Sequence, residues 1–329
     1  LRHRLVPYLY TWARRARAEG VGPVRPLYHD FPTQMGAYAH RTQFLFGDLV
    51  IVPVVHPADP VSTLAREDAW LPRGTWFDVV TGRRYECPDA AGRELTLSRP
   101  LDRLPVLARA GAVVVGAEDL GEAAGDNPRR LSVIVVPGAD GEFVLEEDDG
   151  SPDPGEDGVV RTRFALAWDE AGGAEDGGTA RLTIEQTGPD GVVPAEREIT
   201  VHLLCVDDAS LRADRVGIGS GAGSGAGGGE PVVTARAADG FALGPGVDIA
   251  LGAVRPADGV ELTLTGVRTR PPSLKEEALP ILEAAQIAYS AKDRAWGVIA
   301  SGATGGALLG GVRAAGLPDE ILAAFAEIG

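Results

Sequence analysis

The sequence predicts a mainly β protein, with two consecutive β-sandwiches preceded by one helix and one strand and followed by a small helical tail. Short apolar runs separated by glycine and proline turns recur at roughly 8–12-residue spacing through the middle of the chain, as is typical of β-sandwiches. Helical periodicity is confined to the two ends. The length of 329 residues allows two or three domains with cores of their own.

Residues 1–19 carry the pattern of an amphipathic helix. Its apolar side chains recur at i, i+4, i+7, i+8 and i+11: Leu1, Leu5, Tyr8, Leu9 and Trp12. Gly20 follows as a natural helix stop, and a short strand is predicted from Val24 to Tyr28. A helix leading into a strand is typical of a parallel sheet covered by helices. Because one such pair cannot bury itself, we expect most of that domain to precede Leu1.

The apolar run from Leu49 to Val55 organises the chain that follows. Gly47 and Asp48 predict a turn before it. Its apolar residues are too continuous for a strand with one solvent-exposed face, so the run predicts a strand buried on both faces. Pro53 donates no ladder hydrogen bond, which places the strand near a sheet edge or near its own end.

A first β series extends to about Ala117. Strands are predicted at residues 69–71, 76–80, 95–97, 104–107 and 112–115, with a turn at 72–75. Aromatic side chains surround that turn: Trp70, Trp76, Phe77 and Tyr85. They are the right residues for a platform that stacks on sugars, but their placement around a turn favours packing in the core and hairpin.

A second β series begins near Leu131. Residues 131–136 and 142–146 flank Pro137-Gly138-Ala139-Asp140-Gly141, which predicts a hairpin. Further strands are predicted at residues 159–164, 180–185, 197–205, 232–235, 247–251 and 260–266. Residues 217–229 are almost entirely Gly, Ser and Ala, which predicts a flexible loop or linker.

Helical periodicity returns after Pro271-Pro272. One helix is predicted around Leu274 to Ile287, bent or restarted by Pro280. Others are predicted around Leu308-Leu309 and residues 321–325, with glycines as interruptions at 297, 302 and 305–306.

Composition excludes several classes of function. The formal net charge of −16 opposes nucleic acid and anionic membranes as partners, because both carry the same sign. No apolar run approaches membrane-spanning length, and a cytoplasmic location is favoured. Cys87 and Cys205 form neither a disulfide framework nor a metal-binding spacing.

The chain offers few candidates for chemistry of its own. Glu146, Glu147, Asp148 and Asp149 are consecutive, so they do not form an opposed pair of carboxyl groups across a substrate, and solvated acids at a hairpin tip are favoured over catalysis or calcium. Asp30 ends the predicted first strand, where it is either the wall of a pocket or a loop-capping acid. The five histidines show no metal-ligand spacing and are expected at the surface or in loops: His3, His29, His40, His56 and His202.

Two further motifs carry no functional prediction. Gly223, Gly225 and Gly228 fit G-x-G-x-x-G, but no clear strand leads into them, no helix follows and no Lys is near, so we expect no phosphate loop. Ser210, Ser220 and Ser301 lack a nucleophile-elbow motif, so a serine hydrolase has no support.

An ordered set of motifs resembles the C-terminal part of glycoside hydrolase family 31, the α-glucosidase and α-xylosidase family. The motifs are Leu5-Val6-Pro7-Tyr8-Leu9-Tyr10, Val24-Arg25-Pro26-Leu27-Tyr28-His29-Asp30-Phe31-Pro32, Gln43-Phe44-Leu45-Phe46-Gly47-Asp48, Val52-Pro53-Val54, residues 70–82, residues 101–106, residues 108–112, residues 137–143 and residues 147–150. They lie within residues 1–150 in the order of the family. Any one of them is weak evidence, whereas the ordered set is specific.

The resemblance implies a domain order. Residues 1–45 would be the terminal piece of a (β/α)8 barrel, comprising its last helix and last strand. Residues 46–125 would form a proximal β-sandwich and residues 126–270 a distal one with a Gly-rich loop at 216–230. Residues 271–329 would form the helical tail.

The resemblance also implies a function for the whole enzyme. That function is retaining hydrolysis of α-linked O-glycosyl bonds in carbohydrate metabolism. The family's aspartate nucleophile, aspartate acid/base and substrate-contacting histidine all precede the positions matched here. We therefore expect no catalytic, substrate-binding or metal-binding residue in this chain, no cofactor, and no activity of the chain alone.

The expected partner is an α-glycoside or oligosaccharide substrate, bound through the barrel, and an oligomer is compatible with the sequence. Two other interpretations stay open: a non-catalytic carbohydrate-binding or structural β module, and a degenerate or truncated gene product.

Overall fold

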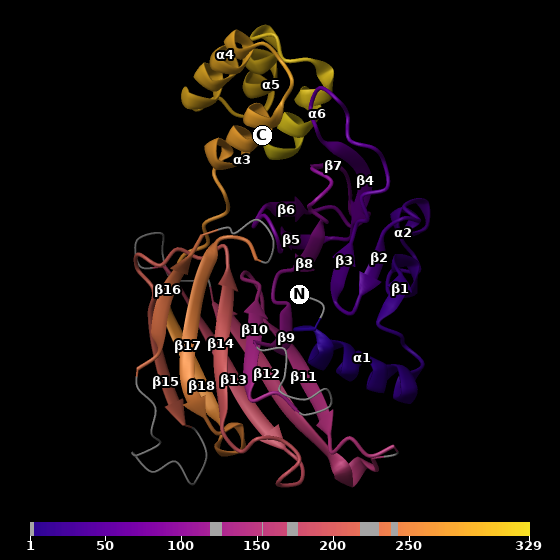
Figure 1. Ribbon diagram of the computed structural model, residues 1–329, viewed down its shortest axis with the longest axis vertical. Coiled ribbons are helices and arrows are strands. Elements are labelled where there is room, and N and C mark those ends of the chain that lie inside the picture. The colour runs from indigo at the N-terminus through magenta and orange to yellow at the C-terminus, as the bar shows by residue number, and fades with distance from the viewer. Residues whose placement is uncertain (1–2, 119–126, 153, 170–176, 218–229, 238–242) are drawn as a thin grey trace. The chain divides into compact units, whose positions relative to one another are not determined.

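The computed structural model describes residues 3–118, 127–152, 154–169, 177–217, 230–237 and 243–329 (Figure 1). The chain divides into two compact units, each assembled from separate segments. Unit 1 contains Leu1–Arg25, Phe46–Leu49 and Ala108–Arg270, and unit 2 contains Pro26–Leu45, Val50–Leu107 and Pro271–Gly329. The predicted glycine-rich loop lies almost wholly outside the described residues.

Unit 1 begins with helix α1 (Val6–Glu19), which confirms the predicted helix but starts later than expected. Pro7 suits the first turn, where its missing N–H would have no helical partner. Gly20 ends the helix in the left-handed region at a φ of 76°, where a glycine carries no Cβ penalty. Of the predicted apolar stripe, Tyr8 and Trp12 are buried, whereas Leu5 and Leu9 are partly exposed and Leu1 lies outside the described residues. The Tyr8 ring stacks on Phe143 with centroids 5.2 Å apart.

Two five-stranded sheets make up most of unit 1. One has the order β16-β17-β14-β10-β9 and the other the order β11-β12-β13-β18-β15. The strands of the first are β9 (Val113–Ala117), β10 (Arg130–Val135), β14 (Arg197–Leu204), β16 (Val232–Arg236) and β17 (Gly246–Val254). Those of the second are β11 (Gly141–Asp148), β12 (Val159–Asp169), β13 (Gly178–Thr187), β15 (Arg212–Gly217) and β18 (Val260–Val267).

The hairpin predicted around residues 137–141 is wrong, although both of its strands exist. Strand β10 pairs with β9 and, in parallel, with β14, whereas β11 pairs with β12 in the other sheet. The turn carries the chain from one sheet to the other. It lies so close to Gly111 that a Cβ on Gly141 would be 1.8 Å from the Gly111 carbonyl oxygen, which explains why both positions are glycine.

Unit 2 contains most of a six-stranded sheet with the order β1-β2-β3-β8-β5-β6, and the two-stranded sheet β4-β7. The strands of the larger sheet are β1 (Val24–Pro26), β2 (Phe44–Phe46), β3 (Leu49–Ile51), β5 (Gly74–Asp78), β6 (Arg84–Cys87) and β8 (Val106–Arg109). The pair is β4 (Ala65–Leu71) and β7 (Arg93–Arg99). All three residues of β3 are buried, but the strand ends at Ile51, short of the predicted Val55, because Pro53 cannot extend a ladder.

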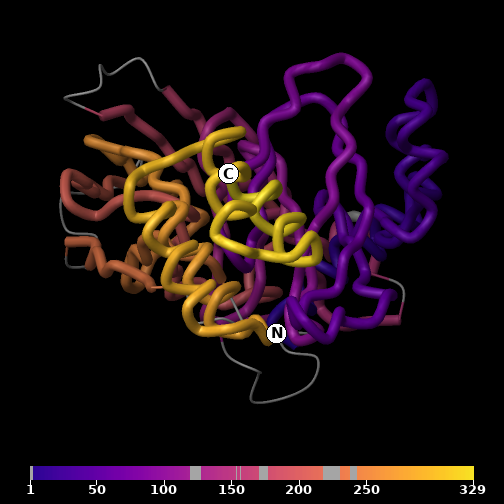
Figure 2. The backbone as a smooth tube through the Cα atoms, turned by 90° about the horizontal axis from the view of Figure 1, so that it is seen from above, coloured from indigo at the N-terminus to yellow at the C-terminus, as the bar shows by residue number. Residues whose placement is uncertain are grey.

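Four helices form the tail of unit 2, shown in gold and yellow in Figure 2. They are α3 (Leu274–Ala284), α4 (Tyr289–Ala300), α5 (Gly305–Ala314) and α6 (Asp319–Ile328). Ser273 and Glu276 cap α3 reciprocally, which satisfies two backbone N–H groups that a helix start leaves open. Pro280 lies inside α3 and Gly297 inside α4, so the break predicted at Gly297 is wrong.

The fold is therefore mainly β, with several sheets and a few helices. Among the described residues, no helix is long and apolar enough to span a bilayer. The barrel piece, the pair of sandwiches and the four domain ranges remain predictions.

Candidate functional site

One segment of unit 2, residues 27–43, packs closely against Trp70 of β4. It contains a 3-10 turn (Leu27–His29) and the short helix α2 (Met35–Ala39). Gln43 donates from Nε2 to the Trp70 carbonyl at 2.7 Å and accepts from the Trp70 N–H at 2.8 Å. A Cβ on Gly36 would lie 2.2 Å from the Trp70 ring, so α2 rests directly on the indole. These contacts fix the position of the segment.

The same segment displays polar and aromatic side chains at the surface. Asp30 follows the 3-10 turn, and its Oδ1 lies 2.9 Å from Nδ1 of the partly exposed His29. The rings of Tyr28 and Tyr38 stack with centroids 5.2 Å apart. Asp30 remains a candidate for either predicted role, pocket wall or loop cap.

The aromatic platform considered at residues 70–85 is buried. Trp70, Trp76, Phe77 and Tyr85 each expose at most 3% of their surface. Trp76 donates from Nε1 to the Pro72 carbonyl at 2.9 Å, inside the turn that the sequence predicts. Core packing is therefore confirmed for these four rings, and none is available to stack on a sugar.

Three of the four acids at residues 146–149 are held in ion pairs and are not freely solvated, contrary to the expectation. Glu146 accepts from Arg14 Nε at 3.0 Å and from Arg161 Nε at 2.9 Å. Asp148 is buried and accepts from Arg14 Nη1 at 3.1 Å. The arginines lie far away in sequence, so the local pattern could not reveal them.

Glu147 forms an ion pair between the two sheets of unit 1. It lies on β11, and Arg197 on β14 donates to both of its carboxylate oxygens at 2.7 and 2.8 Å. The Arg197 side chain is 0% exposed and that of Glu147 is 3% exposed. A bidentate pair in this setting aligns the two sheets. Asp149 alone of the four acids is exposed, as predicted.

His202 is the histidine that departs from the expected surface or loop position. It lies in β14, where its Nδ1 is 2.7 Å from Asp248 and its Nε2 is 3.0 Å from Glu118. The hydrogen bond from His202 lowers the pKa of Glu118, and burial opposes that shift. Arg236 also pairs with Asp248. The imidazole is held between two carboxylates, an arrangement that fits a structural role better than a catalytic one.

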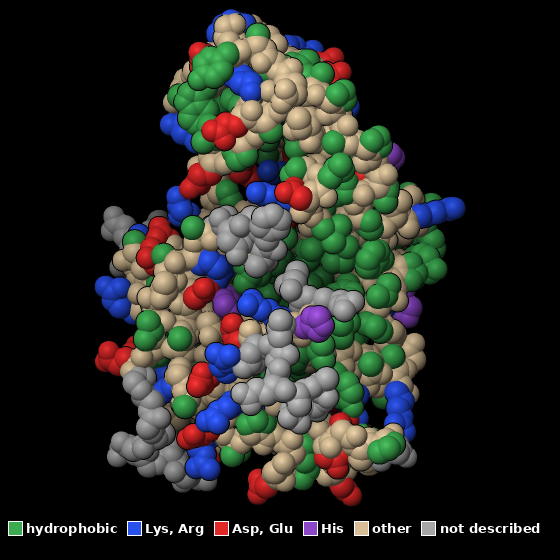
Figure 3. Space-filling model, in the orientation of Figure 1, with side chains coloured by type: hydrophobic (Ala, Val, Ile, Leu, Met, Phe, Trp, Pro, Cys, Tyr) green, Lys and Arg blue, Asp and Glu red, His purple; other side chains and the backbone are tan. Residues whose placement is uncertain are grey.

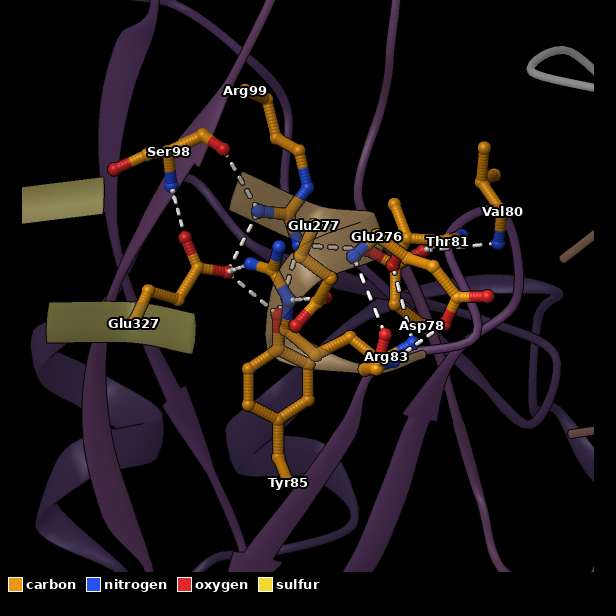
Figure 4. Close-up of polar contacts among 11 residues, drawn as sticks. Asp78, Val80, Thr81, Arg83, Tyr85, Ser98, Arg99, Glu276, Glu277 and Glu327 are labelled. Atoms are coloured by element: carbon orange, nitrogen blue, oxygen red, sulfur yellow. Dashed lines mark hydrogen bonds and ion pairs between the residues drawn. The ribbon is translucent and has the colours of Figure 1, made fainter. Parts of the chain in front are cut away.

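A buried cluster of charged side chains joins the helical tail to the strands of unit 2 (Figure 4). Arg83 precedes β6 and Arg99 ends β7, while Glu277 comes from α3 and Glu327 from α6. Glu327 Oε1 accepts from Arg99 Nη1 at 2.7 Å and also from Arg83. Its Oε2 accepts from the Ser98 N–H at 2.7 Å. One carboxylate thus holds two arginines and a strand backbone.

Neighbouring groups complete the cluster. Tyr85 donates from its hydroxyl to Glu327 Oε1 at 2.7 Å and accepts from Arg99 Nη2 at 2.8 Å. Asp78 Oδ2 accepts from the same Arg99 nitrogen at 2.8 Å. Burial would raise the pKa of Glu327, but Arg99 and Arg83 lower it to about 2. Burial raises the pKa of Glu277, with Arg83 opposing that shift.

A surface groove of about 410 Å³ lies on the tail between α5 and α6. Its lining contains one carboxylate, Asp319, which pairs with Arg313 at 3.2 Å. One exposed, paired carboxylate does not match the two facing carboxyl groups that glycoside hydrolysis needs. In the part of the chain that is described, no group of three or more His, Cys, Asp or Glu side chains is placed to hold a metal ion.

Charge on the surface is mixed. On the face drawn in Figure 3, Lys and Arg side chains lie among Asp and Glu side chains over the sheets of unit 1. The negative net charge is therefore not gathered into one acidic patch on this face.

Residues 20–114 match the family profile described as the glycosyl hydrolase family 31 C-terminal domain. The β-rich fold agrees with this match to a family 31 C-terminal domain. This match supports the resemblance to the C-terminal portion of glycoside hydrolase family 31 that the order of motifs predicts.

Characterised relatives agree with this assignment. An alpha-xylosidase of Saccharolobus solfataricus is 31% identical over 175 residues, which are 52% of this chain and 22% of that protein. Alpha-glucosidase 2 of Bacillus thermoamyloliquefaciens is 29% identical over 152 residues, 46% of this chain and 18% of that protein. The chain thus spans about a fifth of the length of these relatives.

Solved structures show the same fold. A family 31 dextranase of Flavobacterium johnsoniae, complexed with glucose, is 20% identical, with a TM-score of 0.60 over 80% of this chain and 31% of that one. A family 31 alpha-xylosidase from Xanthomonas citri is 28% identical, with a TM-score of 0.50 over 62% of this chain and 21% of that one.

Proposed function

We propose that this chain is the C-terminal part of a retaining α-glycosidase, and that it supports a catalytic barrel rather than performing the chemistry. The observation that carries the proposal is the match of residues 20–114 to the family's C-terminal domain. The relatives named alpha-xylosidase and alpha-glucosidase are several times longer than the matched regions, which leaves room for such a barrel. On this proposal residues 1–45 are the barrel's last helix and strand, followed by a proximal and a distal sandwich.

The side-chain geometry supports a scaffolding role. Three buried carboxylates face arginines: Glu147 faces Arg197, Asp148 faces Arg14, and Glu327 faces Arg99. Retaining glycosidases need two carboxyl groups about 5–5.5 Å apart that can reach one bond. Carboxylates saturated by arginine hold sheets and helices in place instead.

An activity assay of the purified chain tests the proposal directly. Aryl α-glucosides and α-xylosides are expected to release no aryl group above the blank. Turnover that co-purifies with the chain would overturn the scaffolding role.

The mass of the native product provides the second test. An antibody against residues 230–329 is expected to detect a polypeptide far larger than the 34.2 kDa of this chain. That polypeptide, once purified, is expected to cleave an aryl α-glycoside. A larger product without any α-glycosidase activity would contradict the proposed enzyme class.

A further inference from the structure

Tyr28 and Tyr38 form an exposed aromatic stack on the segment described above. Their ring planes are 9° apart, and the side chains are 46% and 44% exposed. The Tyr38 hydroxyl donates to the Pro32 carbonyl at 3.0 Å, which anchors that ring at its edge. A stacked and anchored pair of rings is therefore exposed at the surface.

Met35 extends the same apolar surface. It is the first residue of α2 and lies three positions before Tyr38, so both side chains belong to one side of the helix. Met35 is 80% exposed, and its thioether adapts readily to a ligand's shape. A stable protein–protein interface contains about 20–30 residues from each partner, far more than these three side chains. The surface therefore suits a small ligand.

Two polar residues directly follow Tyr28 in the chain. His29 and Asp30, next to Tyr28 in the chain, are hydrogen-bonded to each other, and their side chains are 47% and 31% exposed. A pyranose presents an apolar C–H face and a rim of hydroxyl groups. Aromatic rings match the face, and a carboxylate with an imidazole matches the hydroxyls.

The backbone under this surface is rigid. The contact of Gly36 with Trp70 and the two hydrogen bonds between Gln43 and the Trp70 backbone fix α2 and its flanks. A binding surface fixed in advance loses little conformational freedom when a ligand binds. Strand β1 runs into this segment, and catalytic sites of (β/α)8 barrels lie after the carboxyl ends of strands.

We propose that Tyr28, Tyr38 and Met35, with His29 and Asp30 beside them, bind a sugar unit of an α-glucan substrate. This inference rests on the proposed function, which supplies the substrate class. The stack contacts the apolar face of one glucose ring, and the His29–Asp30 pair bonds its hydroxyls. None of these residues takes part in bond cleavage.

Saturation-transfer NMR with isomaltotriose and the 329-residue chain tests the proposal. We expect transfer from aromatic protons to the sugar, with a dissociation constant of about 1 mM, as suits one small contact surface. Tyr28→Ala is expected to weaken binding about three- to tenfold, since one aromatic contact contributes on that scale. Tyr28→Phe keeps the ring and is expected to stay within about twofold of the unchanged chain.

Tyr289→Ala is the matched control, because Tyr289 is 77% exposed on the tail of the same unit. It is expected to leave binding unchanged. Absence of transfer at about 20 mM isomaltotriose overturns the inference. Binding that persists unchanged in Tyr28→Ala, with the fold intact by circular dichroism, overturns it as well, because the sugar then lies elsewhere. Either result leaves the proposed function standing, since that proposal is decided by catalysis and not by this contact.

Discussion

Gly36 shows how the absence of one methyl group positions a helix. Its place in α2 brings the backbone against the Trp70 indole, at a distance that no other residue could tolerate. The indole cannot move aside freely, because its Nε1 donates to the Ala91 carbonyl at 2.9 Å and Phe31 packs against the ring edge-on.

Gly36→Ala is expected to destabilise unit 2 by about 1–3 kcal/mol, the usual cost of overpacking a fixed site. Urea unfolding monitored by tryptophan fluorescence measures the change. Gly297→Ala is the control, because Gly297 lies inside α4 with nothing within 4 Å of its would-be Cβ. It is expected to stabilise by about 0.5–1 kcal/mol through helix propensity. Equal effects of the two substitutions would show that the indole contact is not tight.

At the scale of single residues, the sequence predicts burial better than it predicts partners. Trp70 and Trp76 are correctly placed in the core because apolar aromatic residues beside a turn have few alternatives. The burial of Glu147 is missed, because its partner Arg197 is 50 positions away and nothing local marks the pair. The available signal was an arginine on the apolar face of an alternating strand. For β14 that signal is Arg197, with the buried Ile199 and Val201 following on the same face.

At the scale of elements, most strand positions could be predicted and their pairing could not. Strand existence follows from local alternation and turn residues, as in β12 and β18. Pairing depends on contacts far apart in sequence, as in the parallel match of Leu131 with Ile199. The turn at residues 137–141 has hairpin chemistry, but the close approach of Gly141 to Gly111 commits the next strand to the other sheet.

The pair Arg197–Glu147 gives the prediction at this scale, because it joins β14 of one sheet to β11 of the other. Arg197→Met leaves Glu147 buried without a partner and is expected to cost about 3–5 kcal/mol of unfolding free energy. Arg197→Met combined with Glu147→Leu is expected to recover most of that loss, because two apolar side chains replace two buried charges. Chemical denaturation of the single and double variants measures both values.

Arg163→Met serves as the control. Arg163 on β12 pairs with Glu142 on β11, and both side chains are about half exposed. Its cost is expected to be below about 1 kcal/mol. A double variant as unstable as Arg197→Met alone would show that the sheets need the ion pair itself.

At the scale of the whole molecule, we expect stability in acid to depend on the tail cluster. The pKa of Glu327 is about 2 in the folded protein, below the ordinary value of about 4.3 for an unfolded chain. A carboxyl group with a lowered folded pKa contributes stability above its unfolded pKa and loses it as the pH falls toward the folded pKa. The contribution of Glu327 is therefore full above about pH 5 and fades toward pH 2. Glu277, whose pKa is raised by burial, acts in the opposite direction.

Glu327→Gln is expected to lower the unfolding free energy at pH 7 by about 3 kcal/mol and to flatten its decline between pH 5 and pH 2. Thermal unfolding across that pH range measures both effects. Glu283→Gln, on the exposed side of α3, is expected to leave the pH profile unchanged. An unaltered profile in Glu327→Gln would mean that other carboxylates govern acid unfolding.

The family and the mainly β class could be predicted at this scale, because motif order and turn spacing extend over long stretches of sequence. The discontinuous makeup of the two units could not. Unit 2 takes residues from both sides of the 108–270 segment, and the pairing of Arg99 with Glu327 that helps to unite it spans 228 positions. Amphipathic patterns report which face of an element is buried, but not which remote element covers it.

That long separation has a consequence for biosynthesis. A ribosome that has just added Arg83 must add 244 more residues before Glu327 is made. At about 5–20 residues per second this takes about 12–50 s. During that interval the two arginines lack their shared carboxylate, while every segment of unit 1 has already been made by Arg270. Unit 1 can thus mature on the nascent polypeptide, whereas unit 2 must wait for its last helix.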